Sequence, residues 1–312
     1  MFAIFESILP IFLLIIAGNV LRRTPLINDE TWPGLEQLCY WFLYPSLLFI
    51  TIANADFSEL RLDAMLGALI VSVLSFIALV LALWPALRAT GLVRHAQYSS
   101  VFQTAVRWNG FMALAVAQKL FPPEGAAVVA LVMATIIIPI NIASVFVVTR
   151  FADSTASLSK VMLDVARNPM ILAAATAVLL RFMPFDLYPP LNQTLDLVGR
   201  AALGMGLLTI GASLQTDDFR AAGASLWISS FLKLLFFPVL MIAVALGFGV
   251  SGPALSYLAL CAAVPTAMNG FLLARQLGGD APLYASITTV QTALAFFTIP
   301  LVLTVVSQFV SG

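Results

Sequence analysis

Long apolar runs separated by short polar segments are the feature that most limits how this chain can fold. The run 62–86, for example, has Asp63 as its only charged residue. A helix that spans the hydrocarbon core of a bilayer needs about 20 mostly apolar residues. Hydrophobic residues make up 61% of the 312 residues and charged residues 10%, whereas soluble domains carry about 45–50% and about 25%. We therefore predict an all-α polytopic membrane protein.

The hydropathy pattern predicts ten transmembrane helices. Segment 182–196 is Pro-rich and semi-polar, so the predicted seventh helix begins only after it. The ten predicted ranges are 2–21, 37–54, 62–86, 98–120, 126–149, 168–183, 197–214, 225–249, 254–276 and 282–308.

Basic residues predict the orientation, because cytoplasmic loops carry an excess of Lys and Arg. The loops that follow the first, third, fifth, seventh and ninth predicted helices lie on one side and hold nine basic residues: Arg22, Arg23, Arg88, Arg94, Arg150, Lys160, Arg167, Arg220 and Arg275. The other side holds four, namely Arg61, Lys119, Arg181 and Arg200. We therefore expect a multi-pass protein of the cytoplasmic (inner) membrane with both termini on the extracytoplasmic side.

An internal repeat is the most informative pattern. Asn109-Gly110-Phe111 recurs 160 residues later as Asn269-Gly270-Phe271. Further pairs keep nearly this offset: Pro10 with Pro169, Asp56-Phe57 with Asp218-Phe219, and Pro139 with Pro300. The pattern predicts two homologous halves, 1–150 and 168–312, joined by a cytoplasmic linker at 151–167. Five helices in each half make the repeat inverted, and inverted repeats are typical of secondary transporters with a substrate site at the midplane.

The repeated Asn-Gly pairs lie in the middle of the predicted fourth and ninth helices. Glycine costs about 1 kcal/mol in a helix interior, and Pro265 removes a backbone donor four residues before Asn269. We predict that both helices are interrupted, at Asn109-Gly110 and at Pro265 with Asn269-Gly270; if the two breaks cross, the ends of their half-helices converge on one point. The N-terminal end of a half-helix suits a carboxylate. The alternative is simple packing, because Gly and Asn also join neighbouring membrane helices.

Other polar residues in the predicted spans are candidates for a cavity lining. Arg107 is a functional candidate by default, with an ion pair or snorkelling as the alternative. Lys233 either offsets substrate charge or anchors its helix near the cytoplasmic surface. The remaining candidates, each of which alone could be an interhelical hydrogen bond or a packing position, are Gln103, Thr104, Asn141, Thr266, Gln291 and Thr292, with Pro45, Ser46, Gly211 and Ser213 bordering the crossover.

Several function classes lack support. The single histidine, His95, has no plausible ligand set, and Cys39 and Cys261 lie in apolar stretches as reduced packing residues, so we expect no metal or other cofactor. No basic patch suggests nucleic acid. The spans show no nucleophile, metal set or carboxylate pair, which argues against an enzyme. They also lack a central Asp or Glu, which weakens ion coupling through a carboxylate.

Short motifs along the whole chain resemble the bacterial auxin efflux carrier family, which includes malonate and other organic-acid permeases. They include Ile8-Leu9-Pro10-Ile11-Phe12, Tyr44-Pro45-Ser46-Leu47-Leu48-Phe49, Ala166-Arg167-Asn168-Pro169, Leu208-Thr209-Ile210-Gly211-Ala212-Ser213-Leu214 and Ala262-Ala263-Val264-Pro265-Thr266-Ala267-Met268-Asn269. The resemblance implies a fold similar to that of bile-acid symporters and plant auxin exporters, with anions bound beside crossed helices. Asn109, Asn269 and Pro265 match the crossover, whereas Ala105 stands where the fourth helix would have the equivalent proline.

We therefore expect a secondary carrier that moves a small organic anion, such as a dicarboxylate or an auxin-like acid, by alternating access. Its partners are that anion and the lipid bilayer, and a homodimer is kept as the expected assembly. The alternatives are an ion-coupled symporter of a larger, bile-acid-like anion, a channel, or a receptor. Currents faster than carrier turnover would indicate the channel, and ligand binding without flux would indicate the receptor.

Overall fold

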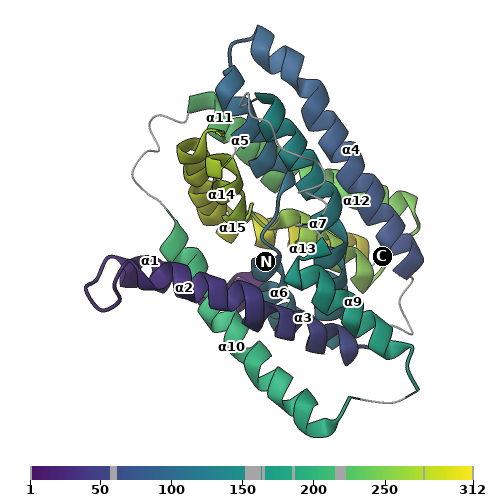
Figure 1. Ribbon diagram of the computed structural model, residues 1–312. Coiled ribbons are helices and arrows are strands. Elements are labelled where there is room, and N and C mark those ends of the chain that lie inside the picture. The colour runs from purple at the N-terminus through teal and green to yellow at the C-terminus, as the bar shows by residue number, and fades with distance from the viewer. Residues whose placement is uncertain are drawn as a thin grey trace.

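The computed structural model describes residues 2–56, 62–151, 163, 166–184, 187–214, 223–276 and 278–310. Within these ranges the regular structure is entirely helical (Figure 1). Most of the predicted linker 151–167 lies outside the described residues, as do Phe57 and the Asp218-Phe219 pair of the repeat.

Seven helices or continuous helical runs in the described part of the chain are long and apolar enough to cross a membrane. They are α1 (Phe2–Arg22), the run α2 (Thr31–Leu38), η1 (Cys39–Leu43) and α3 (Tyr44–Ala53), α4 (Leu62–Ala89), α7 (Pro123–Phe151), α10 (Pro189–Ser213), the run α11 (Gly223–Phe231), η2 (Leu232–Phe236) and α12 (Phe237–Gly247), and α15 (Ala281–Val310). The other predicted spans coincide with shorter helices: α5 (His95–Val106), α6 (Gly110–Leu120), α9 (Pro169–Arg181), α13 (Pro253–Ala263) and α14 (Asn269–Gln276).

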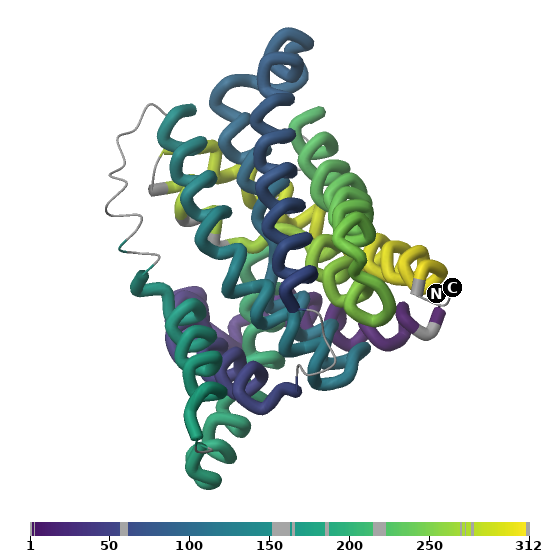
Figure 2. The backbone as a smooth tube through the Cα atoms, turned by 90° about the vertical axis from the view of Figure 1, so that its right-hand side faces the viewer, coloured from purple at the N-terminus to yellow at the C-terminus, as the bar shows by residue number. Residues whose placement is uncertain are grey.

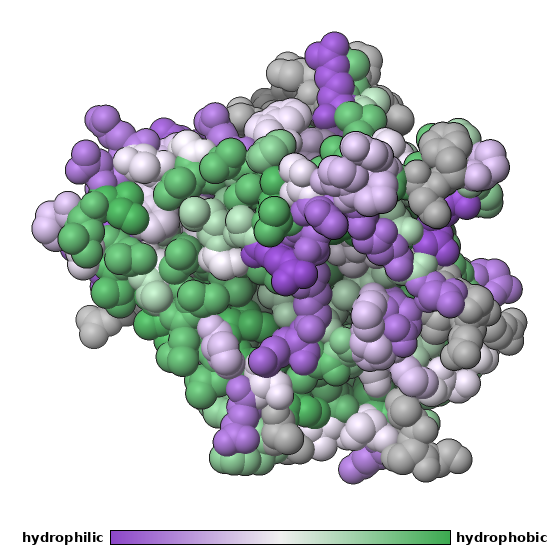
Figure 3. Space-filling model, turned by 90° about the horizontal axis from the view of Figure 1, so that it is seen from below, coloured by the Kyte–Doolittle hydropathy of each residue, from purple (hydrophilic) through white to green (hydrophobic). Residues whose placement is uncertain are grey.

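Large apolar side chains on the surface identify this as a membrane protein. Phe146, Phe297 and Trp227 are each more than half exposed, at 65%, 64% and 62%. Figure 3 shows hydrophobic residues gathered over a broad area of one face. Water would make such a surface costly, whereas lipid tails solvate it.

The predicted starts of the second and seventh helices are wrong, since the helical run that contains α2 begins at Thr31 and not at residue 37. Helix α10 begins at Pro189, whereas the predicted helix began at residue 197. Pro189 and Pro190 occupy its first turn, where proline is favourable because the missing N–H would have no intrahelical partner and φ is already helical. The two prolines, interpreted as part of a loop, therefore start the helix.

Two π-helical segments, η1 in the run α2–α3 and η2 in the run α11–α12, widen their helices, and each lies just before a proline. Pro45 follows η1 and Pro238 follows η2. At the end of each segment a backbone N–H reaches back five residues, from Tyr44 to the Cys39 oxygen and from Phe237 to the Leu232 oxygen. A wider turn accommodates the proline ring, which would otherwise collide with a carbonyl one turn earlier. The helices therefore continue through both prolines.

The helices form two groups (Figures 1 and 2). In the first group α1 packs on α10, and α3 packs on both α9 and α10. In the second group α4, α5, α7, α11, α12, α13 and α15 pack on one another. Helix α6 contacts α7 and α13 of the second group and α1 and α10 of the first, so it lies where the groups meet.

Small residues let α1 and α10 approach closely. A Cβ added at Gly18 would collide with the Leu208 carbonyl, and one at Gly211 would collide with the Ile15 carbonyl. The Asn19 amide also donates to the carbonyl oxygen of Gly211 at 3.1 Å. Ser213 bonds only to its own helix, donating to the Ile210 oxygen at 2.7 Å. The structure thus places Gly211 and Ser213 in the packing of α10.

Candidate functional site

The first helix interruption separates α5 from α6. Helix α5 ends at Val106, Arg107 has extended backbone (φ −73°, ψ 157°), and α6 begins at Gly110. Asn109 is the N-cap of α6, because its Oδ1 accepts a hydrogen bond from the Met112 backbone N–H at 3.0 Å. Asn is among the best residues for this position. The new helix therefore starts at the predicted Asn-Gly pair without a proline.

The second interruption separates α13 from α14 and contacts the first. Helix α13 ends at Ala263, and the chain leaves it at Val264 with extended backbone. The Pro265 carbonyl oxygen accepts a hydrogen bond from the Asn109 backbone N–H at 2.7 Å. Helix α14 begins at Asn269, whose side chain lies outside the described part of the structure. Two segments 156 residues apart in the chain (109 and 265) are thus joined through their backbones.

Buried hydroxyl and amide groups fix the second interruption. The Thr266 N–H donates to Gln291 Oε1 at 3.0 Å, and the Tyr284 hydroxyl donates to the Ala267 carbonyl oxygen. Gln291 in turn donates to the Thr104 carbonyl oxygen at 3.2 Å. Because these groups satisfy one another, Thr266 and Gln291 hold the backbone of the interruption in place.

A cavity of about 80 Å³ lies at the interruptions, several times the ~10–15 Å³ that one water needs. The predicted Arg107, Gly110 and Asn141 are among its lining residues. The rest of the lining consists of Tyr40, Trp108, Phe111, Met133, Ile136, Ile137, Ile140, Asn168, Met170 and Ala267.

Arg107 supplies the charge of the cavity. Its side chain is buried, with 6% of its surface exposed. Nη2 donates to Asn141 Oδ1 at 3.0 Å, while Nε has no hydrogen-bond partner among the described residues. The described lining contains no Asp or Glu. A buried guanidinium with unused donors favours a carboxylate ligand.

Helix N-termini add to this positive potential. Gly110 in the lining is the first residue of α6, and Ala267 precedes the start of α14 by two residues. The third N-terminus belongs to α9, whose N-cap Asn168 lines the cavity. Each N-terminus carries a partial positive charge, although the first N–H groups of α9 are already bonded, those of Met170 and Ile171 to Asn168 Oδ1 and that of Leu172 to the Asn168 carbonyl oxygen. The C-terminal ends of α5 and α13 lie at the same interruptions and carry partial negative charge, so the full charge of Arg107 is what favours anions over neutral or cationic solutes.

Asn168 and Tyr40 were missed as site residues by the sequence reasoning. Asn168 Oδ1 caps α9 by accepting from the Met170 N–H at 2.9 Å, and its Nδ2 donates to the Tyr40 hydroxyl at 3.1 Å. The Asn-Pro pair at 168–169 is an N-cap signal that could have located the helix start. Nothing in the sequence pattern indicates that this helix start faces Arg107.

Several other predicted site residues lie outside the lining. Ser46 donates to the Phe42 oxygen of its own helix, and Pro45 follows η1. A Cβ at Gly270 would collide with the Tyr284 hydroxyl. Gln103 is fully buried, and both of its amide atoms are without a hydrogen-bond partner among the described residues.

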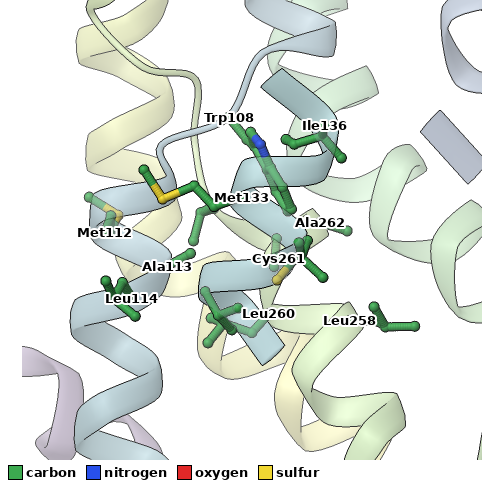
Figure 4. Close-up of a cluster of buried hydrophobic side chains, with 14 of the residues drawn as sticks. Trp108, Met112, Ala113, Leu114, Met133, Ile136, Leu258, Leu260, Cys261 and Ala262 are labelled. Carbon is green, nitrogen blue, oxygen red and sulfur yellow. The ribbon is translucent and has the colours of Figure 1, made fainter. Parts of the chain in front are cut away.

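An apolar wall surrounds one side of the cavity. Figure 4 shows Trp108, Met133 and Ile136 in one buried cluster with Cys261 and Ala262. Both cysteines are free and buried, as predicted. His95 packs between the rings of Trp84 and Phe151. The described residues contain no group of three or more potential His, Cys, Asp or Glu metal ligands. The site thus combines anion-binding groups with an apolar wall.

Comparison with known proteins agrees with this chemistry. A family model described as "Membrane transport protein" matches residues 3–303. The chain is 27% identical to the "Putative malonate transporter" of Rhizobium meliloti (strain 1021) over 282 residues, which covers 87% of this chain and 86% of that protein. It is 21% identical to the "Uncharacterized transporter YfdV" of Escherichia coli (strain K12) over 278 residues, 86% of each chain.

The family model covers almost the whole chain, and the helices and apolar surface are those of a multi-pass membrane protein. The predicted resemblance is therefore confirmed, and the family is one of transporters, not of enzymes. This chain belongs to the membrane transport protein family, that of the auxin efflux carriers.

Proposed function

We propose that this protein is a secondary transporter that moves a small organic anion, with malonate as the first dicarboxylate to test, across the cytoplasmic membrane by alternating access. The observation that carries the proposal is the buried Arg107 in a cavity whose described lining holds no Asp or Glu, beside the N-termini of α6, α9 and α14. The name of the Rhizobium meliloti relative supports the choice of malonate.

The binding groups suit a dicarboxylate. One carboxylate would accept a hydrogen bond from Arg107 Nε, which has no partner among the described residues, and the positive end of the α9 dipole at Asn168 would attract the second. The methylene group between them would lie on the apolar wall. A cavity of about 80 Å³ favours such a small solute over a large, bile-acid-like anion.

The proposed architecture is two inverted halves, 1–150 and 168–312, with ten membrane helices and both termini outside. The matching interruptions before Gly110 and at 264–268 support it, as does the hydrogen bond between them. The two helix groups would move relative to each other and expose the cavity to either side in turn. Arg107 belongs to the second group and Asn168 to the first, so the anion would bind between them.

Counterflow in proteoliposomes tests the proposal. Vesicles loaded with unlabelled malonate should take up labelled external malonate, and small dicarboxylates should compete. Arg107→Gln removes the cavity charge and should cost at least one charge-assisted hydrogen bond, about 1.5–3 kcal/mol, which is about 10- to 150-fold in affinity. The control is Arg200→Gln, because Arg200 is exposed and pairs only with Asp196 of its own helix.

Two results would count against the proposal. One is a lack of counterflow with every small acid in the panel while the protein is folded and reconstituted. The other is equal uptake by Arg107→Gln and the wild type, which would remove the assigned site.

A further inference from the structure

Lys233 is a fully buried amine beside the interrupted helices. It lies in η2 with 0% of its surface exposed. Its Nζ has no hydrogen-bond partner among the described residues. Nζ is 4.7 Å from the centre of the Phe237 ring and 5.8 Å from the centre of the Trp108 ring. Because Trp108 also lines the cavity, the amine and the cavity share this side chain as a neighbour.

No Asp or Glu lies within the described helices that surround Lys233. The described helices that pack against η2 are α5, α11, α12, α13 and α15, and none of them contains an Asp or Glu. Helix α4 reaches Phe237 through Phe76, and its charged residues, Asp63 and Arg88, lie in its first and last turns. The titratable groups on or at the ends of these helices are Arg94, His95, Tyr98, Arg107, Tyr257, Cys261, Asp280 and Tyr284. Asp280 precedes α15 and caps it, because its Oδ1 accepts a hydrogen bond from the Leu283 N–H at 3.1 Å.

The tyrosines and the cysteine on these helices do not offer a fixed negative charge. The Tyr98 hydroxyl donates to the Val80 oxygen and the Tyr284 hydroxyl donates to the Ala267 oxygen. Cys261 is a buried free thiol in the same cluster as Trp108 (Figure 4). A charged amine removed from water is expensive unless it gains a partner, and such a group otherwise gives up its proton.

An anion in the cavity would instead favour the protonated, charged form of Lys233. The C-terminal ends of α5 and α13, at Val106 and Ala263, lie at the interruptions and carry partial negative charge. A carboxylate beside Trp108 adds a full negative charge, and its attraction is weakly screened in a buried site. Unlike arginine, lysine exists readily as either the amine or the ammonium.

We propose that Lys233 is the proton-binding site of this transporter, which binds one proton together with the anion and releases both on the other side. The amine takes the proton from the solution that the cavity faces, forming an N–H bond, and returns it to the opposite solution when the anion leaves. This inference rests on the proposed function. It supplies ion coupling without the intramembrane carboxylate that the sequence lacks.

The first test needs no substrate. Lys233→Met keeps a long, unbranched side chain and removes the titratable group, and Lys119→Met is the control because Lys119 is exposed. Unfolding of the three proteins is measured in mixed micelles between about pH 6 and 9. If the empty folded protein holds a neutral amine, its unfolded chain binds one proton more. As the pH rises, the unfolding equilibrium constant of the wild type should then fall by up to tenfold per pH unit relative to that of Lys233→Met. A ratio independent of pH would overturn the proposal.

The second test separates proton coupling from anion binding. In proteoliposomes, Lys233→Met should retain malonate counterflow but lose the accumulation of malonate driven by an acidic exterior, whereas Lys119→Met should retain both. Accumulation by Lys233→Met would overturn the proposal. Loss of counterflow as well would also overturn it, because the amine would then hold the anion and not the transported proton.

The two proposals fail in different ways. If the wild type shows no counterflow of any acid, the proposed function fails, and the unfolding test still decides whether Lys233 gives up its proton in the empty protein.

Discussion

Two substitutions of Asn109 should separate the stability of the interruption from the binding of the anion. The Asn109 side chain caps α6 through one acceptor, Oδ1, at 3.0 Å from the Met112 nitrogen. Asp keeps this acceptor and adds a negative charge, whereas Ala removes it. The hydrogen bond from the residue-109 backbone to the Pro265 oxygen is available to all three residues.

The magnitudes follow from the cap and the charge. Asn109→Ala should lose about 1 kcal/mol for the cap, rising to as much as ~3 kcal/mol because the N–H of fully buried Met112 is left unpaired. Asn109→Asp keeps the cap, and the helix dipole (about 0.3–1 kcal/mol) together with the nearby Arg107 charge offsets part of the cost of burying a carboxylate at this buried position, so this variant should be more stable than Asn109→Ala. Because the neighbouring Gly110 lines the cavity, the carboxylate of this variant would repel a bound anion, and within about 8 Å at an effective dielectric constant of ~20 this repulsion is about 2 kcal/mol or more. This is about 30-fold in affinity.

The assay pairs unfolding in mixed micelles with equilibrium binding of labelled malonate. Asn28→Ala and Asn28→Asp are matched controls, because Asn28 is an exposed loop residue, and both should remain within about 0.5 kcal/mol of the wild type. The reasoning is refuted if Asn109→Ala is as stable as Asn109→Asp, or if Asn109→Asp binds malonate as tightly as the wild type.

Two further substitutions test the helix packing and the third helix N-terminus. Gly18→Ala should destabilise the protein by about 1–3 kcal/mol, because the added Cβ collides with the Leu208 carbonyl. Gly204→Ala, where a Cβ meets nothing within 4 Å, should instead stabilise α10 by about 0.5–1 kcal/mol. Both variants are compared by unfolding in micelles, and similar losses of stability in the two would contradict the packing account. Asn168→Ala removes the cap of α9, so it should lower the free energy of unfolding by about 1 kcal/mol and also weaken malonate binding. Asn168→Ser keeps a capping oxygen and should restore the stability. An unchanged malonate affinity in Asn168→Ala would exclude this helix end from the site.

The helices and the interruptions were largely predictable because their causes are local. Apolar runs identify the membrane helices, and the Asn-Gly pair at 109–110 marks a helix start because Asn caps the new helix. The approach of α9 to Arg107 was not predictable, because it depends on how distant helices pack. Gly211 shows the same limit: its small size indicates a close approach, but only the structure shows that the neighbour is α1 and not the crossover.

The central claim is that an organic anion binds at Arg107 where the interrupted helices meet. A structure determined with bromomalonate, whose bromine gives an anomalous signal, locates the anion directly. The account predicts a bromine peak inside the cavity with a carboxylate on the Arg107 guanidinium. A peak elsewhere in the protein, with malonate competing for that other position and the cavity free of the anion, would contradict it.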